Sequence, residues 1–445
     1  MTRKYFGTDG IRGKTGEYPI TPEFFIKLGY AAGIVLTKSW NNKQRPAVVI
    51  GKDTRISGYM LESALESGFS SAGVDVLLTG PIPTPAIAFL TKSVGAQFGV
   101  VISASHNSFE DNGIKFFSDL GLKLSDEVEL EIETLLEKEI NRNPSNKLGK
   151  ARRIDDAIDR YVSFCKSTVD SSFNLNSLKI VLDCAHGATY QVAPKVFSDL
   201  GAEVVVINNK PDGLNINNNA GSVHPELLQK SVLNNNADLG IAFDGDGDRV
   251  VMIDSNGNLV DGDQLLLLIV QNYHKKDILK GGVVGTLMTN LAFEEQCKKL
   301  EIPFLRSNVG DRYVSELLHK NKWMLGGENS GHILITNKHS TGDGIISALQ
   351  VLNSIIEAKE SMEDALKSIP MYPQVLINLP LTKKVDLTSS VMERAIIDAK
   401  LIMHNKGRIL IRESGTQPLI RVMTEGPDKE KAIKAADFLI EKIKN

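Results

Sequence analysis

The chain has 445 residues, of which 42% are hydrophobic and 24% charged, a composition typical of a globular protein with several hydrophobic cores. Its formal net charge of -3 and the lack of a Lys/Arg-rich block argue against a nucleic-acid partner. No signal-like apolar run opens the sequence, and no stretch of about 18 uninterrupted apolar residues suggests a membrane span. We therefore expect a cytoplasmic protein that does not associate with membranes.

Three stretches of the chain repeat one order of predicted elements: a β-branched strand, a small-residue turn, a helix and a second strand. They cover residues 46–80, 179–207 and 281–307. Each is typical of a βαβ unit, in which the strands pair in parallel and the helix covers one face of the sheet. Because long stretches separate the units, we expect three similar domains and not a single barrel.

Breaks in this pattern predict three domain boundaries. An amphipathic helix predicted at 155–168 follows the polar stretch 141–150, a turn occupies 254–258, and a Pro-containing stretch covers 368–374. Beyond the last break, strands and helices change order, which indicates an α+β domain. The predicted domains are residues 1–152, 153–256 and 257–369, all mixed α/β, and residues 370–445.

The apolar strand LGIAF leads into a loop that carries Asp244, Asp246 and Asp248. Alternate residues of an extended loop project to the same side, so the three carboxylates can converge. Carboxylates that close repel one another, by on the order of several kcal/mol, unless a cation lies among them. All-oxygen ligation suits Mg²⁺ or Ca²⁺, but Arg249 and Ser255 stand where an EF-hand requires Gly and Glu. A divalent-metal site other than a calcium-sensor loop is predicted.

Another predicted strand ends in the sequence SASHN, which carries Ser105 and His106, and Lys115 follows further along. Polar groups at strand ends commonly form functional sites. The stretch is not a G-x-S-x-G nucleophile elbow, because Ala104 precedes the serine. Adjacent side chains of extended backbone point apart, so His106 is not automatically the base of Ser105, and a structural or ligand-positioning role fits it better.

Two further polar loops have the composition of ligand sites. The stretch RESGTQPLIRV combines hydroxyls, a glycine-exposed amide and two guanidinium groups, which are the parts of a phosphate cradle. It does not have the pattern of a Walker loop. The glycine-rich stretch MLGGENSGHILI places polar side chains where the backbone allows a sugar to approach closely. The residues concerned are Arg412, Ser414, Gly415, Thr416 and Arg421 in the first loop, and Glu328, Ser330 and His332 in the second.

The sequence resembles the α-D-phosphohexomutase superfamily, and within it the branch of bacterial phosphoglucosamine mutases. The resemblance runs almost end to end and includes KYFGTDGIRG, GKDTRISGYMLESALESG, SASHNSFEDNGIKFF, ADLGIAFDGDGDRV, VGTLMTN, VGDRYV, GGENSGH and SGTQPLIRV. It implies four domains around a central cleft, three related mixed α/β domains and a final α+β domain, each of which contributes one loop.

The resemblance also implies a phosphoryl-transfer cycle. Ser105 carries a phosphoryl group and, with Asp244, Asp246 and Asp248, holds one Mg²⁺ per chain. Phospho-Ser105 phosphorylates a hexosamine 6-phosphate, and the resulting 1,6-bisphosphate turns over and returns its other phosphoryl group. Glucosamine 6-phosphate thus becomes glucosamine 1-phosphate, on the route to UDP-N-acetylglucosamine. The sugar 1,6-bisphosphate is the expected activator, whereas a homodimer and the source of the first serine phosphate stay open.

Other residues receive roles from the same resemblance. Arg249 and Lys115 would balance the negative charge of a phosphoserine among three carboxylates. Lys115 and His332 would move the proton of the sugar oxygen. Glu328 and Ser330 would bind sugar hydroxyls. The phosphate that does not react would be held by Arg412, Ser414, Gly415, Thr416 and Arg421, so that remote binding orients the hydroxyl.

The sequence departs from the family pattern at Ser108, where proline is usual, and at Asn329, where phosphoglucosamine mutases usually carry glutamine; His186 and Gln417 also differ. Asparagine reaches one methylene less far, so a contact near the 2-amino group would be lost or bridged by water. One alternative is therefore a phosphomannomutase or phosphoglucomutase of the same superfamily. Two others are a sugar phosphatase, which results if water reaches the phosphoserine, and a non-catalytic sugar-phosphate sensor.

Overall fold

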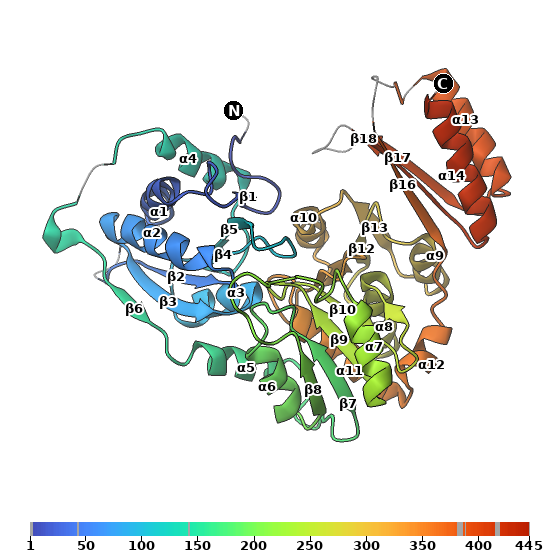
Figure 1. Cartoon of the computed structure of the whole chain (residues 1–445), viewed down its shortest axis with the longest axis horizontal. Helices are drawn as coiled ribbons and strands as arrows, with labels where there is room; N and C mark the ends of the chain where they lie inside the picture. Colours follow the sequence, from blue (N-terminus) through green and yellow to red (C-terminus); the bar gives the residue numbers. More distant parts are fainter. Residues whose placement is uncertain are drawn as a thin grey trace. The chain divides into compact units, whose positions relative to one another are not determined.

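A computed structural model describes residues 3–41, 44–140, 143–380, 386–387, 389–413 and 419–444. The chain divides into two compact units, whose elements are labelled in Figure 1. The first unit joins Met1–Leu287 to Leu305–Ala365, and the second joins Met288–Phe304 to Leu366–Asn445. The three predicted domain boundaries stay a prediction, because compactness alone groups the first three predicted domains largely into one unit.

The first sheet is built around the first predicted βαβ unit and has the order β1-β5-β4-β2-β3-β6. The strands are β1 (Ile11–Lys14), β2 (Ala47–Lys52), β3 (Asp75–Pro81), β4 (Phe98–Ile102), β5 (Asp111–Ser118) and β6 (Ala151–Arg153). Strand β2 is parallel to its neighbours β3 and β4, and β3 is parallel to β6. Strand β5 runs antiparallel to β4 and β1. Four helices accompany the sheet: α1 (Pro22–Leu36), α2 (Ser57–Ser71), α3 (Thr84–Ser93) and α4 (Asp126–Leu136).

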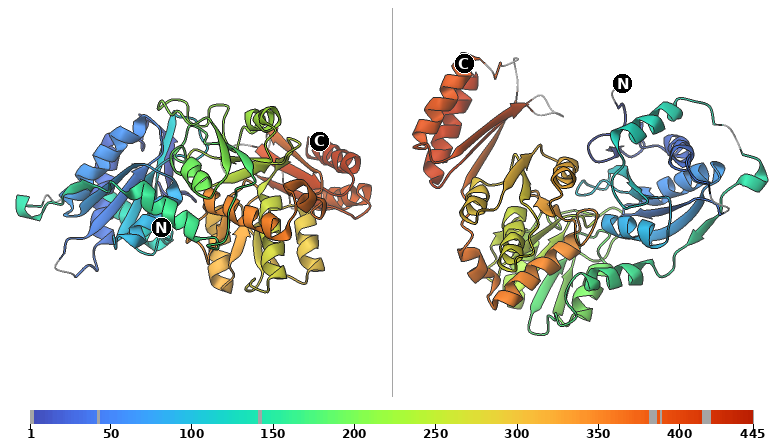
Figure 2. Two further views of the ribbon diagram at one scale, coloured as in Figure 1. Left: turned by 90° about the horizontal axis from the view of Figure 1, so that it is seen from below. Right: turned by 180° about the vertical axis from the view of Figure 1, so that it is seen from behind.

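The two faces of this sheet are covered by different helices. Alternate residues of the strands, such as Val48 and Ile50, join one core cluster with α1, α2 and α4, and these helices lie on the same side of the strands in Figures 1 and 2. On the other face, α3 packs so closely that a Cβ atom at Gly99 would lie 2.2 Å from Thr91 Oγ1. Glycine at this strand position therefore permits the close packing of helix on sheet.

The second sheet has the order β11-β10-β9-β7-β8. It comprises β7 (Lys179–Asp183), β8 (Glu203–Ile207), β9 (Leu239–Phe243), β10 (Val250–Ile253) and β11 (Leu259–Val260), with α5 (Ala157–Ser167), α6 (Val192–Asp199) and α7 (Glu226–Asn235) around it. Strand β7 pairs in parallel with β8 and β9, and β10 runs antiparallel to β9. The second βαβ unit and the amphipathic helix expected at 155–168 are thereby confirmed.

The third sheet has the order β13-β12-β14-β15. Its strands are β12 (Val283–Thr286), β13 (Phe304–Ser307), β14 (Leu325–Gly327) and β15 (Ile333–Ile335), and the accompanying helices are α8 (Gly262–Lys275), α10 (Asp311–Asn321), α11 (Gly344–Ala358) and α12 (Met362–Lys367). Strand β14 is parallel to β12 and antiparallel to β15. All three sheets thus share one arrangement. A strand that pairs in parallel (β4, β9 or β14) is followed along the chain by a neighbour that is antiparallel to it (β5, β10 or β15).

The second unit contains an antiparallel sheet, β16-β18-β17, and is α+β, as predicted. Its elements are α9 (Leu291–Lys299), β16 (Gln374–Pro380), α13 (Ser390–Ile402), β17 (Arg408–Glu413), β18 (Leu419–Glu425) and α14 (Lys429–Lys444). Small and aliphatic residues of α14, among them Ala432 and Leu439, are fully buried in a core cluster with α13 and the sheet. In the described part of the chain, none of the helices combines the length and the hydrophobicity that a membrane span requires.

The buried side chain of His339 links a loop after β15 to helices beside the first two sheets. Its ionisation should make the stability of the protein pH-dependent. His339, which follows β15, has Nε2 3.0 Å from the carbonyl of Pro85 at the start of α3, and its ring packs edge-on against Phe164 of α5. Burial lowers the pKa of His339 to about 4 and outweighs the nearby Pro85 carbonyl, while Lys92 lowers it further. Asp343 Oδ2 also lies 4.0 Å from Nε2.

We therefore expect stability to fall as the pH drops through the range between the pKa of an unfolded histidine and that of His339. The unfolded chain binds the proton first, so acid favours unfolding. Between pH 7 and pH 5 the loss should be about 2 kcal/mol from this residue. Urea unfolding of the wild type and of His339→Gln at both pH values measures it. An identical pH dependence in the two proteins would contradict the assignment.

Candidate functional site

The three loops that the sequence analysis singled out in the first three predicted domains occupy the same place in their sheets. Each leaves the end of a parallel strand and leads into its antiparallel neighbour: residues 103–110 between β4 and β5, residues 244–249 between β9 and β10, and residues 328–332 between β14 and β15. The carboxyl ends of parallel strands are where open α/β sheets commonly bind ligands. The repeated topology therefore brings one loop of each sheet to a common site.

The aspartate loop after β9 gathers three buried carboxylates. Oxygen atoms of Asp244, Asp246 and Asp248 lie within 4.8 Å of one another, which confirms the expected convergence. The loop is a tight turn and not the extended segment that the alternation argument assumed, because Gly247 has a φ of 74°. Glycine is also required at Gly245, since a Cβ atom there would lie 2.7 Å from the carbonyl oxygen of Ser105.

The charges of this loop are incompletely balanced by the protein. Burial, Asp248 and Asp246 raise the pKa of Asp244 well above its usual range. Burial would also raise the pKa of Asp248, but Lys115 and His332 outweigh it and hold that pKa well below its usual range. Among the described residues, Asp246 Oδ1 and Asp248 Oδ1 are buried oxygens without a hydrogen-bond donor. A divalent cation among hard oxygen ligands would satisfy both oxygens and relieve the repulsion.

Ser105 faces this loop directly. Its backbone is in the left-handed region, with a φ of 51°, and its Oγ donates a hydrogen bond of 2.6 Å to Asp244 Oδ2. The expectation that His106 points away is wrong, because it assumed extended backbone: Nδ1 of His106 lies 3.4 Å from Ser105 Oγ. Burial first, and then Arg249 and Arg12, lower the pKa of His106 to about 4, so its imidazole is neutral at physiological pH.

Lys115, on β5, is the main cation of the site. Its ammonium lies 3.0 Å from Asp246, 3.1 Å from Asp248 and 3.1 Å from Asp9, and its side chain is 4% exposed. Burial would lower the pKa of Lys115, but the three carboxylates raise it well above its usual range. Thr84 of α3 adds a neutral donor, with its Oγ1 2.6 Å from Asp246 Oδ2.

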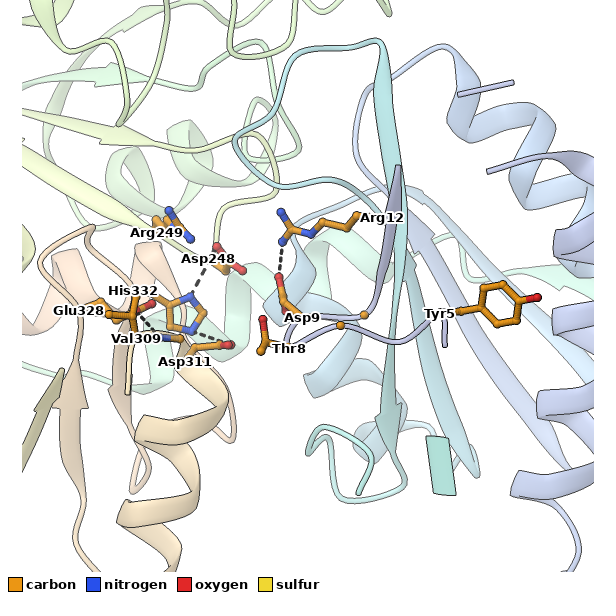
Figure 3. A pocket seen from close by; sticks show the side chains of 13 residues that line it. Tyr5, Thr8, Asp9, Arg12, Asp248, Arg249, Val309, Asp311, Glu328 and His332 are labelled. Atoms are coloured by element: carbon orange, nitrogen blue, oxygen red, sulfur yellow. Dashed lines mark hydrogen bonds and ion pairs between the residues drawn. The ribbon is translucent and has the colours of Figure 1, made fainter. Parts of the chain in front are cut away.

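Beside the aspartate loop opens a cavity of about 450 Å³ (Figure 3). Its wall comes from the N-terminal loop, the aspartate loop, the start of α10 and the loop after β14. The lining residues are Tyr5, Gly7, Thr8, Asp9, Gly10, Arg12, Asp248, Arg249, Val309, Gly310, Asp311, Glu328 and His332. Figure 3 shows His332 between Asp248 and Asp311, across the cavity from Arg12 and Asp9.

His332 is held in this wall by two carboxylates. Its Nδ1 lies 3.7 Å from Asp248 Oδ1, and its Nε2 lies 3.5 Å from Asp311 Oδ2. Burial would lower the pKa of His332, but Asp248, Asp311 and Glu328 raise it to about 9. An imidazole with this pKa carries a proton at neutral pH. Glu328 lies in the same wall and accepts a hydrogen bond of 2.9 Å from the backbone of Gly310.

Several residues in or beside the cavity had no assigned role from the sequence. Asp9 and Arg12 form an ion pair, Asp311 faces His332, and Lys123 bridges Asp9 at 2.6 Å and Asp311 at 2.5 Å. The stretches KYFGTDGIRG and VGDRYV were recognised only as part of a family resemblance, although each places an acidic residue beside glycine and arginine. That combination was the sequence signal that could have identified Asp9, Arg12 and Asp311 as site residues.

Not every predicted residue reaches this cavity. Ser330 is half-buried and does not line the cavity, so its role in sugar binding stays a prediction. Asn329 uses its backbone carbonyl to accept a hydrogen bond of 3.0 Å from Gly262. Gly331 is tightly packed, because a Cβ atom there would lie 2.0 Å from the carbonyl oxygen of Val250. The loop therefore brings Glu328 and His332 to the cavity but holds its middle against β10.

In the second unit, the two arginines of the predicted phosphate cradle lie opposite each other. Arg412 of β17 pairs with Arg421 of β18 in the antiparallel register. Partial burial and the neighbouring Arg421 lower the pKa of Arg412. The Nε atom of Arg421 is buried without a partner among the described residues. Two adjacent guanidinium groups repel each other, so an anion would be attracted to them. Ser414, Gly415, Thr416 and Gln417 lie outside the described residues.

Comparison with known proteins places the chain in a family. Four family models match it in order: "Phosphoglucomutase/phosphomannomutase, alpha/beta/alpha" domain I over residues 3–143, domain II over 159–257 and domain III over 261–372, and the C-terminal domain over 376–442. The chain belongs to the phosphoglucomutase/phosphomannomutase family, which confirms the resemblance to phosphohexomutases and its four-domain α/β fold. Its class is that of isomerases that transfer a phosphoryl group.

Individual relatives and solved structures show which members of the family the chain is similar to. The chain is 58% identical to the phosphoglucosamine mutase of Methylobacillus flagellatus over 96% of both chains, and 57% identical to that of Nitrosospira multiformis over 100% and 97%. Among solved structures, a phosphoglucomutase/phosphomannomutase family protein from Burkholderia thailandensis matches with a TM-score of 0.80 and 22% identity, covering 98% and 96% of the chains. The N-acetylphosphoglucosamine mutase of Aspergillus fumigatus, in complex with GlcNAc-6P and magnesium, matches with a TM-score of 0.68, 16% identity and coverage of 99% and 96%.

The family and the aspartate cluster together indicate a divalent metal ion, and its effect on stability can be measured. We expect added Mg²⁺ to raise the melting temperature, because the ion removes repulsion among three buried carboxylates. At a free concentration of about 100 times Kd the gain should approach 2.7 kcal/mol. Asp246→Asn should weaken the shift strongly, whereas Asp254→Asn, in a turn remote from the cluster, should preserve it. An unchanged shift in Asp246→Asn would place the metal elsewhere.

Proposed function

We propose that the protein is a phosphoglucosamine mutase, which interconverts glucosamine 6-phosphate and glucosamine 1-phosphate through phospho-Ser105 and a 1,6-bisphosphate. The observation that carries this proposal is the contact of Ser105 Oγ with Asp244 at the edge of the aspartate cluster. A serine in that position contacts a cluster that could hold a metal, and the same cluster borders, through Asp248, a cavity lined by the half-buried Arg12 and Arg249. Relatives of that name, 52–58% identical over nearly the whole chain, support the substrate. Such an enzyme supplies the route to UDP-N-acetylglucosamine.

The metal of the proposed enzyme is one Mg²⁺ per chain. Asp244, Asp246, Asp248 and an oxygen on phospho-Ser105 would hold it, since the ion prefers carboxylate and phosphate oxygens. When bound, it would neutralise charge on the transferring phosphoryl group. The two unpartnered oxygens of Asp246 and Asp248 support this assignment.

The protein's own cations would balance the remaining charge. A phosphoserine adds about -1.5 to -2 charges to a site that already has three carboxylates. Lys115 is buried against two of these carboxylates, and Arg249 and Arg12 border the cavity with buried Nε atoms that have no partner in the described structure. Each arginine can therefore turn an unused donor toward a phosphoryl oxygen. Sequence reasoning proposed Lys115 and Arg249 for this task, and the geometry adds Arg12.

Proton transfer falls to two groups that contact Asp248 of the aspartate loop. In the first half-reaction the P–O bond to Ser105 breaks, the P–O bond to the sugar forms, and the sugar hydroxyl loses its proton. The second half-reaction reverses these changes at the other end of the bisphosphate. Neighbouring carboxylates raise the pKa values of Lys115 and His332, so both groups favour their protonated forms. A metal ion on Asp246 and Asp248 would weaken this effect, and the member of the pair that is then neutral could accept the proton of the sugar hydroxyl and return it in the second half-reaction. We assign to this pair the exchange of the proton at the sugar oxygen.

The two ends of the substrate need separate binding groups. Glu328, in the cavity wall, would bind sugar hydroxyls together with Ser330. Arg412, Ser414, Gly415, Thr416 and Arg421 would hold the phosphate that does not react. Because the bisphosphate carries a phosphoryl group at each end, the same groups would serve both half-reactions after it turns over. Free sugar 1,6-bisphosphate would act as an activator by rephosphorylating Ser105.

The central prediction concerns Ser105. Intact mass of the wild type should show a phosphate-sized addition that Ser105→Ala lacks, and the variant should lose phosphoglucosamine mutase activity by at least about a thousandfold, because the stored phosphoryl group is absent. Ser103→Ala, at a neighbouring serine whose Oγ contacts the backbone of Ser105, should keep the addition. Equal activity of the wild type and Ser105→Ala would exclude the mechanism.

A substrate panel separates the remaining candidates. Glucosamine 6-phosphate should be turned over faster than mannose or glucose 6-phosphate. Preference for either of the latter would make the protein a phosphomannomutase or phosphoglucomutase. Release of inorganic phosphate at the rate of substrate loss would indicate a phosphatase, and binding without turnover of the phosphorylated, Mg²⁺-loaded protein would indicate a sensor.

The predicted phosphate cradle can be tested separately. Arg421→Gln should raise KM for glucosamine 6-phosphate by about 10- to 100-fold, the effect of losing one hydrogen bond to a charged group. Arg394→Gln, on α13 of the same unit and outside the two arginine-bearing strands, is the control and should leave KM unchanged. Initial rates over a range of substrate concentrations provide the comparison. An unchanged KM in Arg421→Gln would remove this arginine from the phosphate site.

A further inference from the structure

The loop that carries Ser105 is held from behind by two buried polar side chains. The left-handed backbone of Ser105, with a φ of 51°, is uncommon for serine, yet it turns Oγ toward Asp244. Such a conformation persists only where the surrounding structure enforces it. The backbone carbonyls of Ser105 and Asn107 are both contacted by Arg55 and Asn217.

Arg55, which follows β2, is among the largest fully buried side chains, with 0% exposure. Its Nη2 donates to the carbonyls of Ser105 at 3.2 Å and Asn107 at 2.5 Å, and its Nε lies 3.4 Å from the carbonyl of Ser108. The remaining Nη1 pairs with buried Asp53. The planar guanidinium fork therefore spans the serine loop while its charge is neutralised locally.

Asn217 reaches the same carbonyls from the second sheet's domain. Its Nδ2 donates to Ser105 and to Asn107, both at 2.9 Å. The asparagine is itself anchored, because its backbone N–H donates to the carbonyl of Ala185 at 2.9 Å. The aspartate loop packs on this contact: a Cβ atom at Gly245 would lie 2.6 Å from Asn217 Nδ2. Asn217 thus fixes the serine loop against the loop that carries the metal ligands.

We propose that Arg55 and Asn217 form a carbonyl clamp that positions Ser105 for phosphoryl transfer. The proposal rests on the proposed function of Ser105 as phosphoryl carrier. Neither residue lines the substrate cavity, so both act through the serine loop and are positioning residues. Without the clamp, the backbone of Ser105 can relax to negative φ, which turns Oγ away from Asp244. Misplacement of a reacting atom by about 1 Å can cost about a hundredfold in rate.

The test uses three variants of the full chain with Mg²⁺. Arg55→Lys keeps a cation for Asp53 but loses the planar fork. Asn217→Gly removes the side chain, and glycine accepts the left-handed φ of 57° at this position. Thr54→Val is the matched control: Thr54 Oγ1 donates to the carbonyl of His186 at 2.6 Å, so the variant loses a contact of the same segment with the second domain but no contact with the serine loop.

For Arg55→Lys and Asn217→Gly we expect kcat for glucosamine 6-phosphate to fall about 10- to 100-fold, with KM within about threefold of wild type because the cavity is unchanged. The rate at which glucose 1,6-bisphosphate phosphorylates the dephosphorylated protein, followed by intact mass, should fall in parallel. Thr54→Val should retain the wild-type kcat. Because both residues hold the same carbonyls, the double variant should lose less than the product of the single losses.

Retention of wild-type kcat by folded Asn217→Gly, a rise in KM at constant kcat, or an equal loss in Thr54→Val would overturn the clamp. If Arg55→Lys fails to fold, Asn217→Gly decides the question alone. Failure of the proposed function looks different, because an inactive wild type, or an active Ser105→Ala, would show it before any clamp variant is made.

Discussion

The site depends on the burial of three carboxylates within a few ångströms of one another, against the hydroxyl of Ser105. Such a cluster is unfavourable by itself, because like charges repel strongly once water is excluded. Lys115 neutralises part of the negative charge through its contacts with Asp246 and Asp248. The negative charge that remains, together with burial, raises the pKa of Asp244. The site is thus built with a deficit of positive charge. A divalent cation would supply it, and the arginines of the cavity are available for the further charge of a phosphoryl group.

The repeated sheet topology explains how this cluster is held in place. The backbone carbonyls of the aspartate loop accept hydrogen bonds from Thr84, Ala188 and Gly344, one residue from each of the first three predicted domains. Segments of the first three predicted domains therefore meet on one turn. Glycines Gly245 and Gly247 allow this close packing, since a Cβ atom at Gly245 would lie 2.7 Å from the carbonyl oxygen of Ser105 and one at Gly247 would lie 2.6 Å from Thr189. The glycines of the motif serve this packing, and the aspartates serve the chemistry.

Sequence reasoning predicted what depends on local pattern. The βαβ units follow from β-branched strands and small-residue turns. The convergence of Asp244, Asp246 and Asp248 was predicted from their spacing, although a tight turn and not an extended segment brings them together. It could not predict contacts that require distant segments to meet, such as Lys123 between Asp9 and Asp311. Nor could it predict the left-handed backbone of Ser105, because serine has no local preference for it and tertiary contacts impose it.

The expectation for His106 was wrong because the rule for extended strands was applied beyond the end of a strand. Period-two alternation applies to extended strands, and the strand β4 ends at Ile102, three residues before Ser105. Beyond that point the backbone turns, and adjacent side chains can approach each other. Arg55 was part of a recognised stretch, but a fully buried arginine cannot be distinguished from an exposed one by composition or periodicity. Its partners in the serine loop are backbone carbonyls, which carry no sequence signal.

The most direct measurement of the central claim follows a single phosphoryl group. Protein labelled at Ser105 with radioactive phosphate is mixed with Mg²⁺ and excess unlabelled glucosamine 6-phosphate, and the label is traced during the first turnover. The account predicts that label leaves the protein and appears in glucosamine 1,6-bisphosphate and then in glucosamine monophosphate. Label that stays on the protein while product forms, or that leaves only as inorganic phosphate, would contradict it.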